Sequence, residues 1–113
     1  MPFIDCKFSQ QLTPHEKENL KSNLGKLISI LHKPECYLMV GIEDKYDLYF
    51  AGTKLEAGAY IAISAFGEPR PADCEKMTAA VCKLLKEELG INGTSVYITY
   101  QGIENWGYNG NNF

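Results

Sequence analysis

The stretch that decides the fold is residues 3–31, FIDCKFSQQLTPHEKENLKSNLGKLISIL. Its first residues alternate, with Ile4, Cys6 and Phe8 on one side and charged residues on the other, which is the period of a half-buried strand. Its later residues are apolar at helical spacing. A strand followed by a helix with one apolar face is therefore predicted. The apolar stripe of that helix comprises Leu20, Leu24, Leu27, Ile28 and Leu31.

Capping residues set the bounds of this predicted helix. Thr13 is a favourable N-cap, Pro14 suits the first helical position, and Glu16 completes a capping box. The Lys33-Pro34 pair then ends the helix, because the residue before a proline is disfavoured in the helical region. The helix should therefore begin at Pro14 and end shortly before Lys33.

The same order of elements recurs along the chain. Residues 36–42 predict a second strand, and residues 59–66 a third that is largely apolar on both faces, as in a strand buried from both sides. A second helix is expected to begin at Ala72, which is 58 residues after the start of the first helix at Pro14. Gly90 should end this second helix. Residues 95–100 form the last β-branched and aromatic run. These elements together form two strand–helix–strand units.

Each unit requires a right-handed crossover with its helix on one face of the sheet. Two such units side by side predict an α+β fold, with a four-stranded sheet and two helices on one face, in a single domain over residues 1–113. Residues 44–49 and 102–113 are expected outside the duplicated core, as short edge ribbons or loops. The other sheet face, which carries residues such as Tyr60, stays uncovered, so oligomerisation is expected on physical grounds.

Composition excludes several classes of protein. The chain has 113 residues, of which 45% are apolar and 22% charged, with a formal net charge of −3, as in a globular domain. It lacks a basic run or zinc-finger pattern, so nucleic acid is not an expected partner. No apolar stretch approaches the ~20 residues of a membrane span, so no membrane insertion is expected. Because the start does not resemble a secretory leader, we predict a cytoplasmic protein and leave export without a leader open.

Neither the cysteines nor the histidines have the spacing of a metal or thiol redox site. There is no Cys-x-x-Cys pair, and small core side chains are the expected role of the cysteines. His15 and His32 have no acidic or cysteine companion at ligand spacing and should be solvated. No metal or organic cofactor is expected. The cysteines are Cys6, Cys36, Cys74 and Cys82.

The chain starts with Met1-Pro2, and methionine before a small residue is usually removed during synthesis. The new end would be a secondary amine on a rigid ring, with an ordinary pKa of about 8. Burial or a nearby cation lowers the pKa of an amine, so such a group can act as a general base at neutral pH. Two interpretations stay open here, a merely processed start and a catalytic amine.

Several short motifs follow one another along the chain: Met1-Pro2, Lys33-Pro34, Ala65-Phe66-Gly67, Val96-Tyr97-Ile98, Asn105-Trp106-Gly107-Tyr108-Asn109-Gly110 and Phe113. In this order and spacing they resemble the tautomerase superfamily over essentially the whole chain. The branch that the chain is most similar to contains macrophage migration inhibitory factor and D-dopachrome tautomerase. The resemblance implies a homotrimer with active sites between neighbouring subunits, and keto–enol tautomerisation of small aromatic α-keto acids such as phenylpyruvate.

The resemblance also implies roles for individual residues. Pro2 matches the general acid/base, and Lys33 matches a cation that holds the substrate carboxylate and keeps the amine neutral. Phe66 lies where the family binds substrate through a backbone group, and Tyr97 matches a tyrosine from the adjoining subunit. Thr99 replaces the usual asparagine near it, and with Phe66 it is expected to shift substrate preference. The residues that match the pocket mouth are Tyr37, Trp106, Tyr108 and Phe113.

Structural alternatives remain for these residues. Lys33 has the position of a lysine that merely closes a helix, and Tyr37 and Tyr97 have the pattern of ordinary sheet packing. The aromatic residues of the tail have a structural alternative too, in which they only anchor the tail to the domain. If Met1 stays attached, the nitrogen of Pro2 is an amide without a basic lone pair. The alternative function is a secreted, cytokine-like signalling protein that binds a cell-surface receptor and keeps a weak or vestigial site.

Overall fold

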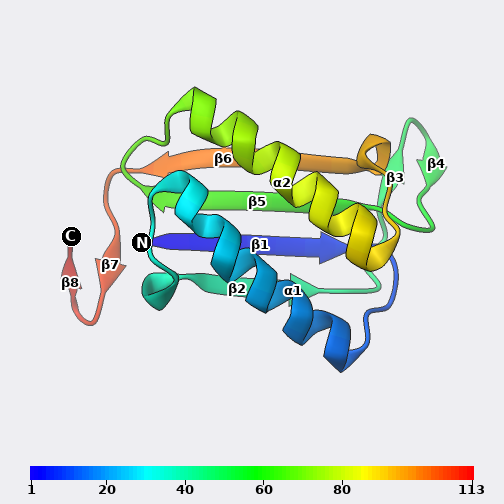
Figure 1. Cartoon of the computed structure of the whole chain (residues 1–113), viewed down its shortest axis with the longest axis horizontal. Coiled ribbons are helices and arrows are strands. Elements are labelled where there is room, and N and C mark those ends of the chain that lie inside the picture. The colour runs from blue at the N-terminus through cyan, green and yellow to red at the C-terminus, as the bar shows by residue number, and fades with distance from the viewer.

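A computed structural model describes residues 1–113 and places two α-helices across one face of a four-stranded sheet (Figure 1). Neither helix has the length and hydrophobicity needed to cross a membrane. The main elements are β1 (Pro2–Phe8), α1 (Pro14–Leu27), β2 (Met39–Glu43), β5 (Ala59–Phe66), α2 (Pro71–Leu89) and β6 (Val96–Ile103). The short ones are the 3₁₀ turns η1 (Ile28–Leu31), η2 (Glu35–Tyr37) and η3 (Gly93–Ser95), and the strands β3 (Tyr49–Phe50), β4 (Thr53–Lys54), β7 (Gly107–Tyr108) and β8 (Asn111–Asn112).

The strand order is β2-β1-β5-β6. Within each half the two strands are parallel, β1 with β2 and β5 with β6, and the two halves meet along the antiparallel pair β1–β5. Pro2 lies opposite Ala65 and Lys7 opposite Tyr60 in that central pair. This topology confirms the prediction of two strand–helix–strand units with both helices on one face.

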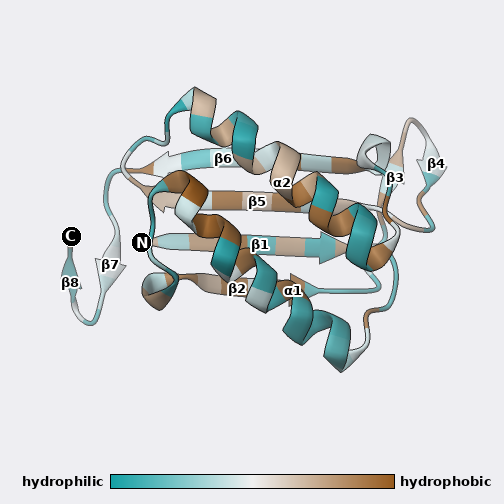
Figure 2. Cartoon of the chain, in the orientation of Figure 1, coloured by the Kyte–Doolittle hydropathy of each residue, from teal (hydrophilic) through white to brown (hydrophobic).

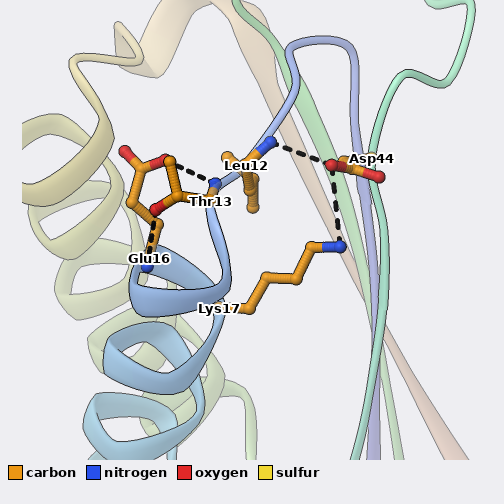
Figure 3. Close-up of polar contacts among 5 residues, drawn as sticks. All are labelled: Leu12, Thr13, Glu16, Lys17 and Asp44. Atoms are coloured by element: carbon orange, nitrogen blue, oxygen red, sulfur yellow. Dashed lines mark hydrogen bonds and ion pairs between the residues drawn. The ribbon is translucent and has the colours of Figure 1, made fainter.

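The start of α1 is stabilised by the predicted capping box (Figure 3). The amide of Glu16 donates to Thr13 Oγ1 at 3.1 Å, and Glu16 Oε1 accepts from the amide of Thr13 at 2.9 Å. Asp44, which follows β2, accepts from the amide of Leu12 at 2.9 Å and lies 3.6 Å from Lys17 Nζ. The hydrogen bond from Leu12 lowers the pKa of Asp44. Side-chain contacts therefore connect the end of β2 to the beginning of α1.

Several predicted boundaries differ from the observed ones. The last strand runs over Val96–Ile103 instead of residues 95–100, and the second helix begins at Pro71, one residue early. The first helix ends at Leu27, and its last apolar residues continue as the tighter 3₁₀ turn of residues 28–31, which closes at His32 with a φ of 60°. The second strand begins at Met39, because residues 35–37 form another 3₁₀ turn. Apolar spacing alone cannot separate these turns from the helix and the strand that they adjoin.

The core lies between the helices and the sheet. Alternate residues of β1 and β5 are buried, and the positions between them are half-buried on the face without helices. The hydropathy view shows β5 as largely hydrophobic (Figure 2). Within one chain, however, β5 is fully buried on one face only, and the prediction of burial on both faces is not met. The largest fully buried side chains include Phe8, Ile4, Leu24, Ile28, Ile61 and Met77.

The internal repeat extends beyond the predicted units, because each half ends in a small hairpin. Residues 49–54 pair as β3–β4 and residues 107–112 as β7–β8, which is the same arrangement 58 residues later. Both hairpins lie outside the four-stranded sheet and its two helices, and the tail forms one of the expected short ribbons, while residues 102–103 belong to β6 instead. The repetition of the hairpins was not predicted, because two-residue strands are too short to show a hydrophobic period.

The two hairpins match in their turns and in their closing hydrogen bonds. Ala51 has a φ of 51° and is followed by Gly52 at 83°, while Asn109 has a φ of 51° and Gly110 one of 82°. Leu55 donates from its amide to the carbonyl of Leu48 at 2.9 Å, and Phe113 donates to Trp106 in the same way at 3.0 Å. The whole chain thus consists of two copies of one unit, hairpins included.

Candidate active site

A cavity of about 630 Å³ lies at the N-terminal end of β1, beside η2 and β7. Most of its lining is hydrophobic, and β1 contributes Pro2, whose side chain is fully buried. η2 contributes Tyr37, and the C-terminal segment contributes Trp106 and Tyr108. These four predicted site residues are therefore brought together by the fold. An apolar cavity with a few polar groups at one end is the usual form of a small-molecule site.

The main chain of Phe66 links the polar groups at this end of the sheet. Its amide donates to the carbonyl oxygen of Met1 at 2.9 Å, and its carbonyl accepts from Lys33 Nζ at 2.9 Å. The nitrogen of Pro2 is bonded to that same Met1 carbonyl, so it lies two bonds from the oxygen. The amide and the carbonyl of Phe66 thus connect the start of the chain to the lysine ammonium, although Met1 and Lys33 are more than thirty residues apart in sequence.

The electrostatics of this corner act on an amine. Burial lowers the pKa of the Met1 amino group, and the positive charge of Lys33 lowers it further. Both effects disfavour the protonated form, because that form carries a charge that must be desolvated and that repels the lysine. An amine at this end of β1 therefore loses its proton at a lower pH than an exposed one.

Lys33 is positioned by the segment that precedes it. His32 has a left-handed backbone, and its Nε2 lies 3.3 Å from Asp73 Oδ2. Asp73 is in the first turn of α2 and is only 6% exposed, and Arg70 Nε lies 3.5 Å from the same oxygen. α2 starts a few residues after Phe66. This contact therefore joins the segment with Lys33 to the segment with its acceptor.

A chain of aromatic rings extends from the cavity to the end of β5. Tyr37 meets Tyr108 edge to face at 6.1 Å between ring centroids, and Tyr108 stacks on Phe113 at 5.9 Å. Phe113 in turn packs on Phe66 at 6.0 Å. Phe113 lies outside the main cavity, in a neighbouring hollow of about 230 Å³ that it shares with Tyr108. Of the residues predicted for the pocket mouth, Phe113 alone does not line this cavity.

Tyr97 and Thr99 lie toward the other end of the sheet. In the sheet register, Tyr97 on β6 pairs with Tyr60 on β5, and Tyr60 pairs with Lys7 on β1. Lys7 is five residues from Pro2 along β1, so the rise per residue separates Tyr97 from Pro2 by about 17 Å along the strand direction. Tyr97 packs edge to face on Phe50 at 5.5 Å, and Thr99 Oγ1 hydrogen-bonds Tyr60 Oη at 2.9 Å. A single chain therefore does not bring these two residues to the cavity.

The structure adds residues that sequence reasoning missed. Cys36 and Met39 line the cavity, and Cys36 is exposed, so its prediction as a core residue was wrong. It lies in η2 rather than in a buried strand, and its position before Tyr37 was the available signal. Cys6 does lie in the core, where burial raises the pKa of its thiol to about 12. No group of three or more His, Cys, Asp or Glu side chains is placed to hold a metal ion.

Comparisons with known proteins agree with this architecture. The sequence profile of the family described as Macrophage migration inhibitory factor (MIF) matches residues 1–113. No curated protein sequence matches the chain. The crystal structure of Leishmania major MIF2 has 30% sequence identity and a TM-score of 0.93, with 100% of this chain and 97% of that chain covered. A macrophage migration inhibitory factor homologue from Prochlorococcus marinus has 25% identity and a TM-score of 0.88, with 98% of each chain covered.

A more distant structure shares the fold alone. Pt0534, which was crystallised after inactivation by 2-oxo-3-pentynoate, has 16% identity and a TM-score of 0.84, with 96% of this chain and 92% of that chain covered. The profile match spans every residue from the first strand to the second hairpin, and the structural matches preserve the same arrangement. The chain therefore belongs to the macrophage migration inhibitory factor family.

Proposed function

We propose that this protein is a keto–enol tautomerase for small aromatic α-keto acids such as phenylpyruvate, with the amine of Pro2 as the general acid/base. One observation carries this proposal: the main chain of Phe66 contacts the beginning of the chain through its amide and the ammonium of Lys33 through its carbonyl. The base that we propose is thereby connected to a cation and a backbone donor at the end of the sheet where Met1 and Pro2 line the apolar cavity, although Lys33 and Phe66 do not line that cavity themselves.

Removal of Met1 would free two groups at once. The nitrogen of Pro2 would change from an amide to a secondary amine with a basic lone pair. The amide of Phe66, which donates to the Met1 carbonyl at 2.9 Å, would lose that acceptor and become available to a substrate oxygen. The Met1 carbonyl therefore occupies the place that we assign to a substrate oxygen.

The reaction needs only a proton shuttle. The neutral amine takes a proton from the carbon beside the keto group, and the C–H electron pair becomes the double bond of the enol. The protonated amine then returns that proton to the substrate oxygen, so no atom is gained or lost. Lys33 holds the carboxylate, and Tyr37 and Trp106 contact the aromatic ring. Positioned proton transfer of this kind contributes about 10²- to 10⁴-fold in rate.

We further propose that the protein works as a homotrimer, because Tyr97 and Thr99 are too far from the cavity of their own chain. Tyr97 is 65% exposed on the sheet face that has no helix, so a neighbouring subunit can present it to the cavity. Its hydroxyl would then orient the substrate while its ring completes the wall. This assembly would also cover the half-buried face of β5.

The direct test is Pro2→Gly in protein whose N-terminus has been verified by mass spectrometry. We expect phenylpyruvate tautomerisation to fall about tenfold or more, because the rigid secondary amine is replaced by a primary one. Sedimentation of both proteins should give the same oligomeric state. An unchanged rate in a correctly processed, trimeric variant would reject Pro2 as the base.

A covalent probe identifies the reacting nitrogen independently of turnover. 2-Oxo-3-pentynoate, which inactivated Pt0534, carries an alkyne conjugated to a keto group, and a neutral amine adds to such an alkyne. We expect one added molecule per chain, mapped to Pro2 by peptide mass spectrometry. Cys36 is the competing nucleophile, so Cys36→Ser is the matched control variant. Labelling that disappears in Cys36→Ser would contradict the assignment.

The second candidate is a secreted, cytokine-like binding protein, which is the function that remains if Met1 is retained, because the nitrogen of Pro2 is then an amide without a basic lone pair. In that case the cavity would serve as a recognition surface for a cell-surface receptor. Turnover by protein that lacks Met1 separates the two functions. A processed sample without activity on phenylpyruvate would favour the signalling role.

A further inference from the structure

We propose that the ring of Phe66 is a positioning group that holds Phe113 out of the Pro2 cavity and so keeps that cavity open to an aromatic ligand. The inference rests on the proposed function only in calling this ligand a substrate. It concerns the side chain of Phe66, whereas the proposed reaction uses only its main-chain groups.

The internal repeat shows what a hairpin does without such a ring. Leu55 in the first hairpin is the counterpart of Phe113 in the second, because each directly follows the second strand of its hairpin. The backbone amide of each also donates to the carbonyl of the residue just before the first strand of that hairpin. Leu55 lines the hollow at its own end of the sheet, and that hollow measures only about 70 Å³. Phe113 does not line the corresponding cavity, which measures about 630 Å³.

The difference between the two ends is one residue in strand length. β1 has 7 residues and β5 has 8, and both begin with a buried residue. The eighth residue of β5 is Phe66, and because side chains alternate it lies on the opposite face from its buried neighbour Ala65. β1 ends at the buried Phe8 and has no such extra ring. The first hairpin therefore has nothing that holds Leu55 outward.

The physical chemistry favours inward movement of Phe113 once its partner is lost. Phe113 is 54% exposed, and its aromatic partners are Phe66 and Tyr108. Tyr108 also lines the cavity, so an apolar space adjoins the partner of Phe113, and transfer of an exposed ring into such a space is favourable. A ring in the cavity would compete with the aromatic ring of a substrate, and it would leave Pro2 and Lys33 unchanged.

The test is a double-mutant cycle with Phe66→Leu in the native and in the Phe113→Ala backgrounds. We expect Phe66→Leu to raise the KM for phenylpyruvate about 2- to 10-fold, the range of one aromatic pair, with kcat little changed. In the Phe113→Ala background no ring remains to enter the cavity, so the same substitution should leave KM unchanged. Leucine keeps the main-chain groups that contact Met1 and Lys33.

A second measurement needs no turnover. Trp106 is the only tryptophan and lines the cavity, so acrylamide quenching of its fluorescence reports how open the cavity is. Phe66→Leu should lower the quenching constant, and it should have no effect in the Phe113→Ala background. Tyr46→Leu is the matched control, since Tyr46 is also partly exposed but contacts Lys7 at the other end of β1.

The outcomes separate this inference from the proposed function. Equal effects of Phe66→Leu on KM and quenching in both backgrounds would overturn it, because Phe113 would then not be the intermediary. A quenching constant that does not change in Phe66→Leu would overturn it as well. If every variant lacks turnover but quenching shows the expected dependence on Phe113, the proposed function fails and the role of Phe66 stands.

Discussion

The two halves of the chain have one backbone plan, yet only the first carries the amine and the cation of the proposed reaction. Pro2 and Ala59 each begin a strand, and each helix starts with a proline in its first turn. Each helical segment closes at a left-handed residue, which Lys33 follows in the first half and Ile91 in the second. Ile91 is fully buried, whereas Lys33 reaches the carbonyl of Phe66.

The cavities at the two ends of the sheet differ in the same way. The first end has about 630 Å³, and the second, where Leu48, Phe50 and Leu55 fill the space, about 70 Å³. The second half therefore serves as an internal control that has the scaffold without the amine or the cation. The comparison teaches that the strand–helix–strand plan supplies geometry, while a few side chains at one end supply the proposed reactivity.

The largest expected effect comes from giving the second half the lysine of the first. Ile91→Lys places a charge at a fully buried position without a partner, which should lower the free energy of unfolding by about 3–5 kcal/mol. Urea unfolding followed by circular dichroism measures this, with Ile91→Leu as the control of similar volume. A loss below about 1 kcal/mol would mean that the two positions are less different than their burial indicates.

The reciprocal change, Lys33→Ile, should act on activity rather than stability. Loss of the ammonium that we assign to the substrate carboxylate should lower kcat/KM about 10- to 100-fold, which is the range of a charged hydrogen bond. The free energy of unfolding should change by less than about 1 kcal/mol, because Lys33 makes a single partly buried hydrogen bond. Steady-state kinetics with phenylpyruvate and urea unfolding test both parts. Equal kcat/KM in the two proteins would remove Lys33 from the site.

The pH profile sharpens the same comparison. Burial and the charge of Lys33 lower the pKa of the Met1 amino group, and we expect the same two causes to act on a free amine at Pro2, which can accept a proton only when neutral. In processed protein, kcat/KM should therefore fall as the pH drops through an amine pKa that lies below the ordinary value of about 8. In Lys33→Ile the midpoint should move to higher pH, because the repelling charge is gone. A midpoint that stays in place would leave burial as the only cause.

The smallest expected effect concerns the turns of the two hairpins. The second turn has Asn109 at a φ of 51°, whereas the first has Ala51 at the same angle. Asparagine tolerates this left-handed region better than alanine does, so Ala51→Asn should raise the free energy of unfolding by about 0.5–1 kcal/mol. Thermal unfolding should show a higher Tm, and Asn109→Ala should lower it. A lower Tm for Ala51→Asn would contradict the equivalence of the turns.

Local chemistry explains which features could be predicted from sequence. The period of residues 3–8, the capping box at Thr13 and the stop at Gly90 each depend on neighbours along the chain, and all appear in the structure. Short ribbons were expected in the tail, but the repetition of the hairpins escaped prediction because their strands have two residues each. The exposed position of Cys36 was missed because a 3₁₀ turn interrupts the apolar run that it begins.

The sequence supplied candidate residues for the site but not their arrangement. Pro2, Tyr37, Trp106 and Tyr108 line one cavity, and their roles in it stay predictions. The position of Phe113 against Phe66, outside that cavity, depends on contacts between segments that are distant in sequence. The separation of Tyr97 from Pro2 within one chain depends on strand register, which pairs residues from different parts of the sequence.

By itself, the sequence determined the two strand–helix–strand units and the chemical groups at their ends, because periodicity, capping and the amine of a terminal proline are properties of neighbouring residues. Tertiary structure alone decided that Lys33 and Met1 both hydrogen-bond to the main chain of Phe66, and that one end of the sheet has a large cavity while the other has a small one. The physical reason is that cavity volume and the distance between remote groups follow from how the elements pack, which no local pattern encodes.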